Sequence, residues 1–334
     1  MDNLYLIFFI PLIFITNFFL KKKKILLNYT GQKHQTYTFG DYIPLSGGFF
    51  IILFFIINFN NYSYLFLIYL LIFYITGLIA DLNILKSPNL RFILQIIILF
   101  FFIINFDLSI ADVRIDFIND LLENYFFNIF FVLFCLLVFI NGSNFIDGNN
   151  GLAIGYFLII YLSLISILSK NDSFEINLLI SFSMLLIIIL IFNLTNQFYL
   201  GDNGIYLLSI YTGFILINFF KNNPEFSPYF IANLLWYPAF EILFSMVRKM
   251  KYKFSPMKPD IFHLHQLIFY YLKQKLNLRK NMINSVTGIV INFYNCLVIY
   301  FATLNVSNTE IQISLLSISV LFYLFCYLYF YKFK

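Results

Sequence analysis

Charged side chains are scarce in this sequence, and their scarcity excludes a water-soluble globular protein. Only 11% of the 334 residues are Asp, Glu, Lys or Arg, whereas 61% are hydrophobic. A soluble domain is typically about a quarter charged, because its surface must be wetted. The net charge of +5 is small and the bases lie near hydrophobic segments. This pattern also argues against nucleic acid as the partner.

Cysteine is rare as well, and its placement excludes a disulfide framework. Cys135, Cys296 and Cys326 each lie inside an apolar run, with no metal-type spacing. They are expected to be buried thiols. Aromatic residues are abundant, with 47 Phe, but they occur together with many Ile, Asn and Lys. That combination is typical of a nucleotide-composition bias, so it indicates no aromatic recognition surface.

What the sequence has instead is a series of long apolar runs. A bilayer core of about 30 Å is crossed by helices of roughly 17 to 25 apolar residues, because lipid leaves backbone groups no other partners. Eleven spans are predicted, over residues 4–20, 46–59, 64–80, 92–106, 125–140, 152–169, 178–195, 205–220, 229–247, 282–304 and 311–331. The second and fourth are short enough to be half-buried in protein instead. The prediction is an all-α integral membrane protein in one domain, residues 1–334.

The distribution of bases predicts the orientation of the chain. Lys and Arg stay on the cytoplasmic side of membrane proteins. With the N-terminus outside and the C-terminus inside, 18 of the 21 bases fall in cytoplasmic segments, and only Arg114, Lys170 and Lys221 fall outside. The loop 107–123 then carries five acids outside. The first apolar segment is expected to be a retained span, since it has neither the positively charged n-region of a signal peptide nor a cleavage-type tail before Lys21.

Four aspartates share the predicted cytoplasmic side, in loops or helix ends beside Gly, Asn or His. They are Asp81, Asp147, Asp202 and Asp260. Each one alone could be a helix cap or a solvated loop residue. Together they favour a divalent cation, and hard oxygen ligands point to Mg²⁺, with Mn²⁺ as the alternative, more than to zinc.

Three short stretches carry the chemistry that such a site requires. The segment Asn144-Phe145-Ile146-Asp147-Gly148 offers amide and carboxylate oxygens beside a glycine that lets the backbone approach a ligand. In Leu200-Gly201-Asp202-Asn203-Gly204 an aspartate stands at the start of a span, where a helix N-terminus suits a phosphate. His263 and His265 form a His-x-His pair in the most basic loop, which alone is a weak signal for a ligand site.

The order and spacing of these motifs resemble those of the polyprenyl-phosphate N-acetylhexosamine-1-phosphate transferases. These enzymes form glycosyltransferase family 4, which is related to phospho-N-acetylmuramoyl-pentapeptide transferase. Five pieces match in family order and together cover most of the chain. They are Lys33-His34 with Pro44-Leu45-Ser46-Gly47-Gly48, then Gly77-Leu78-Ile79-Ala80-Asp81 with Leu85, Pro88, Arg91 and Gln95, then the Asn144 and Leu200 segments, and finally Pro238, Arg248 and Ser255-Pro256 with Asp260 to His265.

The resemblance implies a reaction and its partners. A sugar 1-phosphate, expected to be N-acetylhexosamine 1-phosphate, would pass from a UDP-sugar to polyprenyl (undecaprenyl) phosphate, with release of UMP at the start of lipid-linked glycan synthesis. The expected location is the inner (cytoplasmic) membrane, with the active site on the cytoplasmic face. A homodimer is suggested by family analogy alone.

The same resemblance assigns roles to the acids and histidines. Asp202 is the first choice for a Mg²⁺ ligand, with Asp147 as the second. Asp81 would manage the acceptor phosphate or its proton. His263 and His265 would hold the diphosphate or the sugar phosphate.

Substrate contacts are expected from residues that flank these groups. They are Lys33, Asn144, Asn150, Tyr199, Gly201 and Arg248. Lys33 would neutralise phosphate charge, Asn144 would shape the nucleotide or metal site, and Tyr199 would stack on uracil, although simple interfacial packing explains an aromatic there equally well.

The sequence departs from the family pattern at three places. Ala80 stands where a second acid is usual, Asn150 where an Asp is common, and Glu241 where an Asp is common. Two alternatives therefore stay open. One is the muramoyl-pentapeptide transferase within the family, and the other is a secondary transporter or lipid flippase, which would use membrane acids for ion coupling.

Overall fold

The computed structural model describes residues 3–27, 43–168, 173–251, 253 and 260–334. In this part of the chain the regular structure is helical, apart from an isolated β-bridge between Leu27 and Pro44. The all-α prediction is therefore confirmed. The elements are the 3₁₀-helices η1 (Asn3–Phe8) and η3 (Phe59–Asn61) and the α-helices α1 (Phe9–Lys23), α2 (Gly47–Ile57), α3 (Tyr64–Asp81), α4 (Pro88–Asn105), α5 (Asp116–Leu122), α6 (Tyr125–Ile146), α7 (Leu152–Ile167), α8 (Ser173–Leu194), α9 (Gly201–Asn222), α10 (Pro228–Lys251), α11 (Leu264–Lys275), α12 (Lys280–Leu304) and α13 (Thr309–Tyr331).

The helices have the length and the surface of membrane spans. Within the described ranges, nine helical segments are long and apolar enough to cross a bilayer, and α2 and α7 are shorter apolar helices. Phe8, Phe126 and Phe325 are 74%, 79% and 68% exposed, which suits contact with lipid rather than water. The protein is therefore an integral membrane protein. The count of eleven spans and their orientation remain predictions; the fourth predicted span, α4, is long enough to cross, whereas α2 is short.

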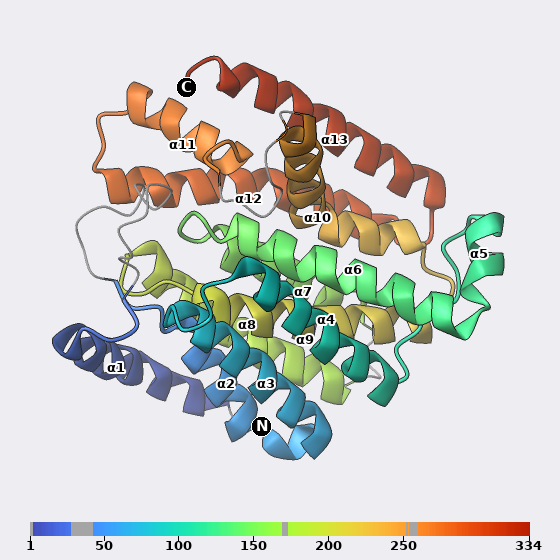
Figure 1. Cartoon of the computed structure of the whole chain (residues 1–334), viewed down its shortest axis with the longest axis horizontal. Coiled ribbons are helices and arrows are strands. Elements are labelled where there is room, and N and C mark those ends of the chain that lie inside the picture. Colours follow the sequence, from blue (N-terminus) through green and yellow to red (C-terminus); the bar gives the residue numbers. More distant parts are fainter. Residues whose placement is uncertain (1–2, 28–42, 169–172, 252, 254–259) are drawn as a thin grey trace.

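Helix α9 is the centre of the bundle. It packs against α3, α2 and α6, and Figure 1 shows it surrounded by them. Small residues permit this close approach, as in other membrane helix interfaces. A Cβ atom on Gly77 of α3 would lie 2.4 Å from the Asn203 Cα atom, and a Cβ atom on Gly213 of α9 would lie 2.5 Å from a methyl group of Leu136. The start of α9 is thus fixed tightly against α3.

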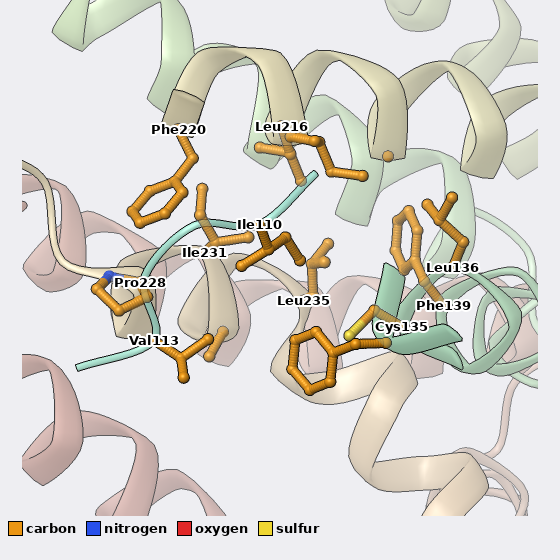
Figure 2. Close-up of a pocket in the computed structure, with 14 residues that line it drawn as sticks. Ile110, Val113, Cys135, Leu136, Phe139, Leu216, Phe220, Pro228, Ile231 and Leu235 are labelled. Atoms are coloured by element: carbon orange, nitrogen blue, oxygen red, sulfur yellow. The ribbon is translucent and has the colours of Figure 1, made fainter. Parts of the chain in front are cut away.

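An apolar pocket of about 250 Å³ lies beside α9 at Gly213. Figure 2 shows Leu136 and Phe139 of α6 on one side, facing Leu216 of α9 and Leu235 of α10. Its lining is entirely apolar apart from the thiol of Cys135. The pocket therefore offers space for an apolar group and no group for catalysis.

The two ends of the bundle differ. In Figure 1 the loop after α6, α11 and the C-terminus lie toward the left, and α5 lies at the right. At the α5 end, the Arg114 guanidinium donates to the Ser307 carbonyl at 3.3 Å and to the Glu225 and Phe226 carbonyls at 3.2 Å. These bonds join three loops at the end that carries the loop 107–123.

Two helices lie in segments that the sequence pattern predicts to be loops. Helix α5 lies in the acidic segment 107–123, and its 7 residues are too few to cross a membrane. Helix α11 follows the His-x-His pair and buries Leu264, Leu267 and Ile268, an apolar stripe at helical spacing. The lysines in its last turn lower the hydrophobicity of the segment, so the stripe does not appear as an apolar run in the sequence.

The prediction of buried thiols is wrong. All three cysteines are free, but Cys296 is exposed, and Cys135 and Cys326 are only partly buried. Helix faces that contact lipid are apolar without being buried in protein, so an apolar run does not by itself indicate burial.

Replacement of Gly77 by Ala should destabilise the protein more than replacement of Gly213 by Ala. At Gly77 the new methyl group meets backbone atoms of Asp202 and Asn203, which cannot move independently, whereas at Gly213 it meets a Leu136 methyl group that borders an open pocket. Overpacking of this kind costs about 1–3 kcal/mol. Thermal midpoints of the two purified variants in one detergent would test the order, and equal midpoints would contradict it.

Candidate active site

The N-terminus of α9 is capped by a side chain from another helix. The carboxylate of Asp81, at the end of α3, accepts the Asp202 N–H at 3.0 Å and the Asn203 N–H at 3.0 Å. It also accepts from the Asn203 side-chain amide. The residue before the helix, Leu200, supplies no side-chain cap. Asp81 thus satisfies N–H groups that otherwise lack partners at a helix start.

A glycine makes this approach possible. Gly201 has a φ of +76°, and a Cβ atom there would lie 2.8 Å from an Asp81 carboxylate oxygen. Side chains other than glycine rarely adopt that conformation. The Gly-Asp-Asn-Gly stretch therefore presents the Asp202 side chain at a fixed position beside Asp81. Sequence reasoning assigned Asp81 to the acceptor phosphate or its proton, and this capping role is additional to that prediction.

Asp202 is paired with Arg91. The Arg91 Nη1 atom lies 3.0 Å from the Asp202 Oδ2 atom. Arg91 is held in turn by the Leu85 carbonyl, to which its Nε–H donates at 2.7 Å. The Asn144 side chain lies near Asp202 as well. The sequence motif includes Arg91 but predicts no role for it. Its position as a base close to Asp81 at a membrane edge is the signal that indicates a pairing with an acid.

Asp147 completes a group of three carboxylates. It follows α6 directly, and it lies near Gly201 at the start of α9. Burial raises the pKa of the Asp147 carboxyl, and the charges of Asp202 and Asp81 raise it further. Three acids thus face one paired guanidinium and the positive end of α9. This excess of negative charge favours the binding of a cation.

The oxygen atoms at this position fit Mg²⁺ in part. Among the described residues, no group of three or more His, Cys, Asp or Glu side chains could hold a metal ion by itself. Mg²⁺ commonly takes one or two carboxylates and completes its shell with water and substrate phosphates. Asp147 and Asp202 can supply that pair, because both carboxylates lie at the start of α9.

The two histidines lie at the start of α11, in a second charged group. The His263 Nδ1 atom lies 2.9 Å from the Glu241 Oε1 atom, and its Nε2 atom lies 3.4 Å from the Asp260 Oδ1 atom. The Tyr323 hydroxyl donates to the other Glu241 oxygen at 2.8 Å. Glu241 therefore fixes the orientation of the His263 ring.

His265 is buried and neutral. Only 1% of it is exposed, and its Nδ1 atom has no hydrogen-bond partner in the described part of the chain. Burial lowers the pKa of His265 to about 3, although the carboxylates of Glu241 and Asp260 act in the opposite direction. The ring can donate a hydrogen bond to a phosphate, but it carries no positive charge near neutral pH.

Arg248 is engaged inside the histidine loop. Its guanidinium lies 2.8 Å from an Asp260 carboxylate oxygen, donates to the Tyr327 hydroxyl at 2.9 Å and also donates to the Phe262 carbonyl. Burial opposes the ionisation of Asp260, but the neighbouring His263 and Arg248 lower the pKa of this carboxyl overall. The predicted contact of Arg248 with substrate stays a prediction.

The segment after α6 joins the two groups. A Cβ atom on Gly148 would lie 2.6 Å from the His265 Nε2 atom, and the Phe145 ring makes an edge contact with His263 at 5.0 Å between centroids. Asp147 lies between these contacts in the chain. Most of the predicted site residues therefore come together, from the ends of α3, α6, α9 and α11.

Asn150 and Tyr199 belong to a neighbouring network. The Asn150 side-chain amide donates to the Asn196 Oδ1 atom at 2.8 Å, and the Tyr199 hydroxyl donates to the same atom at 3.4 Å. Asn150 is 2% exposed and also donates to the Ser285 hydroxyl of α12 at 3.3 Å. Through these bonds both side chains are joined to Asn196, and Asn150 is also joined to α12. Lys33 lies outside the described residues, as do His34, Ser255 and Pro256.

Replacement of Asp81 by Ala should lower stability, whereas replacement of Asp147 by Asn should not. Asp81→Ala removes the cap of α9, a loss that costs about 0.5–2 kcal/mol. Asp147→Asn removes one charge from a crowd of three and so leaves stability equal or higher. Thermal midpoints of the purified variants, relative to wild type, would test this contrast. A midpoint for Asp81→Ala at or above that of Asp147→Asn would show that the cap contributes no stability.

Acid should destabilise the wild type more than a His265→Gln variant. As the pH falls below 6.5, unfolded His265 takes up a proton that the buried ring, with its pKa of about 3, does not accept. The unfolded state then binds more protons, so the folding equilibrium falls by up to about tenfold per pH unit. The change in thermal midpoint between pH 6.5 and pH 5 measures this effect. Parallel curves for the two proteins would contradict the buried, neutral state.

Comparison with known proteins gives two matches. Residues 62–220 match the model of a family described as Glycosyl transferase family 4. The chain is also similar to the undecaprenyl-phosphate alpha-N-acetylglucosaminyl 1-phosphate transferase of Thermotoga maritima, with 29% identity over 140 residues. The aligned segment covers 42% of this chain and 42% of that relative. The chain thus spans about two fifths of the length of the curated relative that it matches.

Proposed function

We propose that this chain, whose residues 62–220 match Glycosyl transferase family 4, transfers a sugar 1-phosphate from a UDP-sugar to polyprenyl phosphate. The observation that carries the proposal is the meeting of Asp81, Asp147 and Asp202 at the start of α9. The donor is an N-acetylhexosamine derivative and the acceptor is undecaprenyl phosphate, by analogy with the Thermotoga relative.

In the proposed reaction, an oxygen of the acceptor phosphate attacks the β-phosphorus of the UDP-sugar. A new P–O bond forms, the bond between the β-phosphorus and the bridging oxygen breaks, and UMP leaves with that oxygen. Phosphoryl transfer of this kind depends mainly on positioning and on neutralisation of charge. The acceptor phosphate is largely ionised near neutral pH, so the reaction does not depend on a strong base.

The residues at the start of α9 would position the donor. Asp147 and Asp202 would hold Mg²⁺, with Asn144 beside them. When bound, that ion would withdraw charge from the diphosphate. Asp81 would act as a positioning residue, because its carboxylate holds the backbone of Asp202 and Asn203. Arg91 would keep the Asp202 carboxylate oriented.

The histidine loop would contact the phosphates of the substrate. Glu241 and Tyr323 hold the His263 ring in one orientation. His265 is neutral and lies against Gly148, next to Asp147. Because the ring carries no charge, it would donate a hydrogen bond to a phosphate without repelling the cation. A lipid acceptor accounts for a site at the membrane edge, which we place on the cytoplasmic face of the inner membrane.

The test is UMP release by the purified protein given undecaprenyl phosphate and UDP-N-acetylglucosamine, with and without Mg²⁺. We expect release that requires both the lipid and the metal, and a loss of at least about a hundredfold in Asp202→Asn, the order found when one charge-stabilising group is removed. Asp107→Asn is the matched control, because Asp107 is an exposed carboxylate paired with Lys221. It should retain wild-type turnover.

Two outcomes would contradict the proposal. Near-normal release by a folded Asp202→Asn variant would remove this carboxylate from the site. No release with UDP-N-acetylglucosamine, other UDP-N-acetylhexosamines or the UDP-muramoyl-pentapeptide would reject the reaction class. Release with the muramoyl-pentapeptide alone would assign the chain to the other branch of the family.

A further inference from the structure

A polar cavity lies outside the three-carboxylate group. It has a volume of about 1110 Å³ and is formed by the end of α1, the segment after α8 and the start of α12. We call it the α1–α12 groove. The lining residues that matter here are Lys21, Thr195, Asn196, Arg279, Lys280 and Ser285. Three of them are bases and none is an acid, so the groove has the charge that an anion requires.

The polar groups of the groove are mostly hydrogen-bond donors or amides. Lys21 and Arg279 are exposed, and Arg279 precedes α12 without making a side-chain cap. Cations and N–H groups at the start of a helix both attract phosphate. A metal cation would find no matching charge in this lining.

The groove is attached to the candidate active site through Asn150. This buried side chain donates to Asn196 and Ser285, both of which line the groove. Its Oδ1 atom has no hydrogen-bond partner among the described residues. Tyr199 contacts Asn196 as well. The wall of the groove is therefore continuous with the segment that carries Asp147.

The position of the groove at the ends of two membrane helices restricts its occupant. Both α1 and α12 are long and apolar enough to span a bilayer, so their basic ends lie near the membrane boundary. Basic pockets between membrane helices bind the phosphates of anionic lipids. We propose that the α1–α12 groove binds the phosphate headgroup of an anionic lipid.

The test measures binding by the full-length protein and needs no turnover, so it is independent of the proposed reaction. One arm measures retention of phosphatidylglycerol in phosphatidylcholine nanodiscs by mass spectrometry. The other measures the affinity for UDP by calorimetry. The variant Lys21→Gln with Arg279→Gln removes two charges from the groove. At roughly the contribution expected for each base near an anionic lipid, its affinity for the occupant should fall by about thirtyfold.

Two further variants control for charge and for space. Lys22→Gln with Lys332→Gln removes the same charge from exposed positions that do not line the groove, and it should bind like wild type. Thr195→Trp fills the groove from its exposed edge without changing its charge. It should weaken binding in the same arm as the Lys21 and Arg279 variant.

Each result either supports or overturns the proposal. Loss of phosphatidylglycerol retention with UDP affinity unchanged supports the proposal. Loss of UDP affinity alone overturns it, because the bases would then serve the nucleotide of the proposed reaction. Wild-type binding of both probes by the Lys21 and Arg279 variant overturns it. An equal loss in the Lys22 and Lys332 control overturns it too, because the effect would then be one of net charge. Asp202→Asn should retain binding in the lipid arm, which separates this site from the proposed active site.

Discussion

The candidate site depends on one interaction, the capping of α9 by the Asp81 carboxylate. Without it, the first N–H groups of α9, a largely buried helix, would lack partners. The cap crosses between helices, so it fixes the end of α3 against the start of α9 and places Asp202 as a consequence. Gly77 and Gly201 permit the two backbones to approach closely enough. The geometry of the acids therefore follows from helix packing, and the site is as rigid as the centre of the bundle.

The sequence predicted the class of fold and most members of the site, and the reasons are physical. Apolar runs long enough to cross lipid identify α3, α6, α9 and α12 without further information. Short motifs with Asp, Asn and Gly mark the ends of helices, so Asp81, Asp147 and Asp202 were found by their positions. Helix α11 was missed because its buried stripe is only twelve residues long and carries lysines on its exposed face. The pairs Arg91 with Asp202 and His263 with Glu241 could not be predicted, since they join residues that are distant in sequence.

The charge balance of the site separates binding from stability. The pKa of Asp147 is raised by burial and by the two other acids. Such a carboxylate does not help the folded state, so its presence is better explained by a ligand than by packing. The histidine loop shows the opposite balance. There Glu241, Asp260, Arg248 and His263 pair with one another, which suits a structural support for the neutral His265 ring.

The departures at Ala80 and Asn150 are compatible with this arrangement. Ala80 is 3% exposed and its carbonyl accepts from Arg91, so a second acid there would add charge to a buried position already near three carboxylates. Asn150 donates through its amide to Asn196 and Ser285, and an aspartate could not make those bonds without a proton. The neutral amide thus links the motif after α6 to α12 by hydrogen bonds alone. The bases near position 150 are those of the α1–α12 groove. Their charge suits an anion rather than a cation.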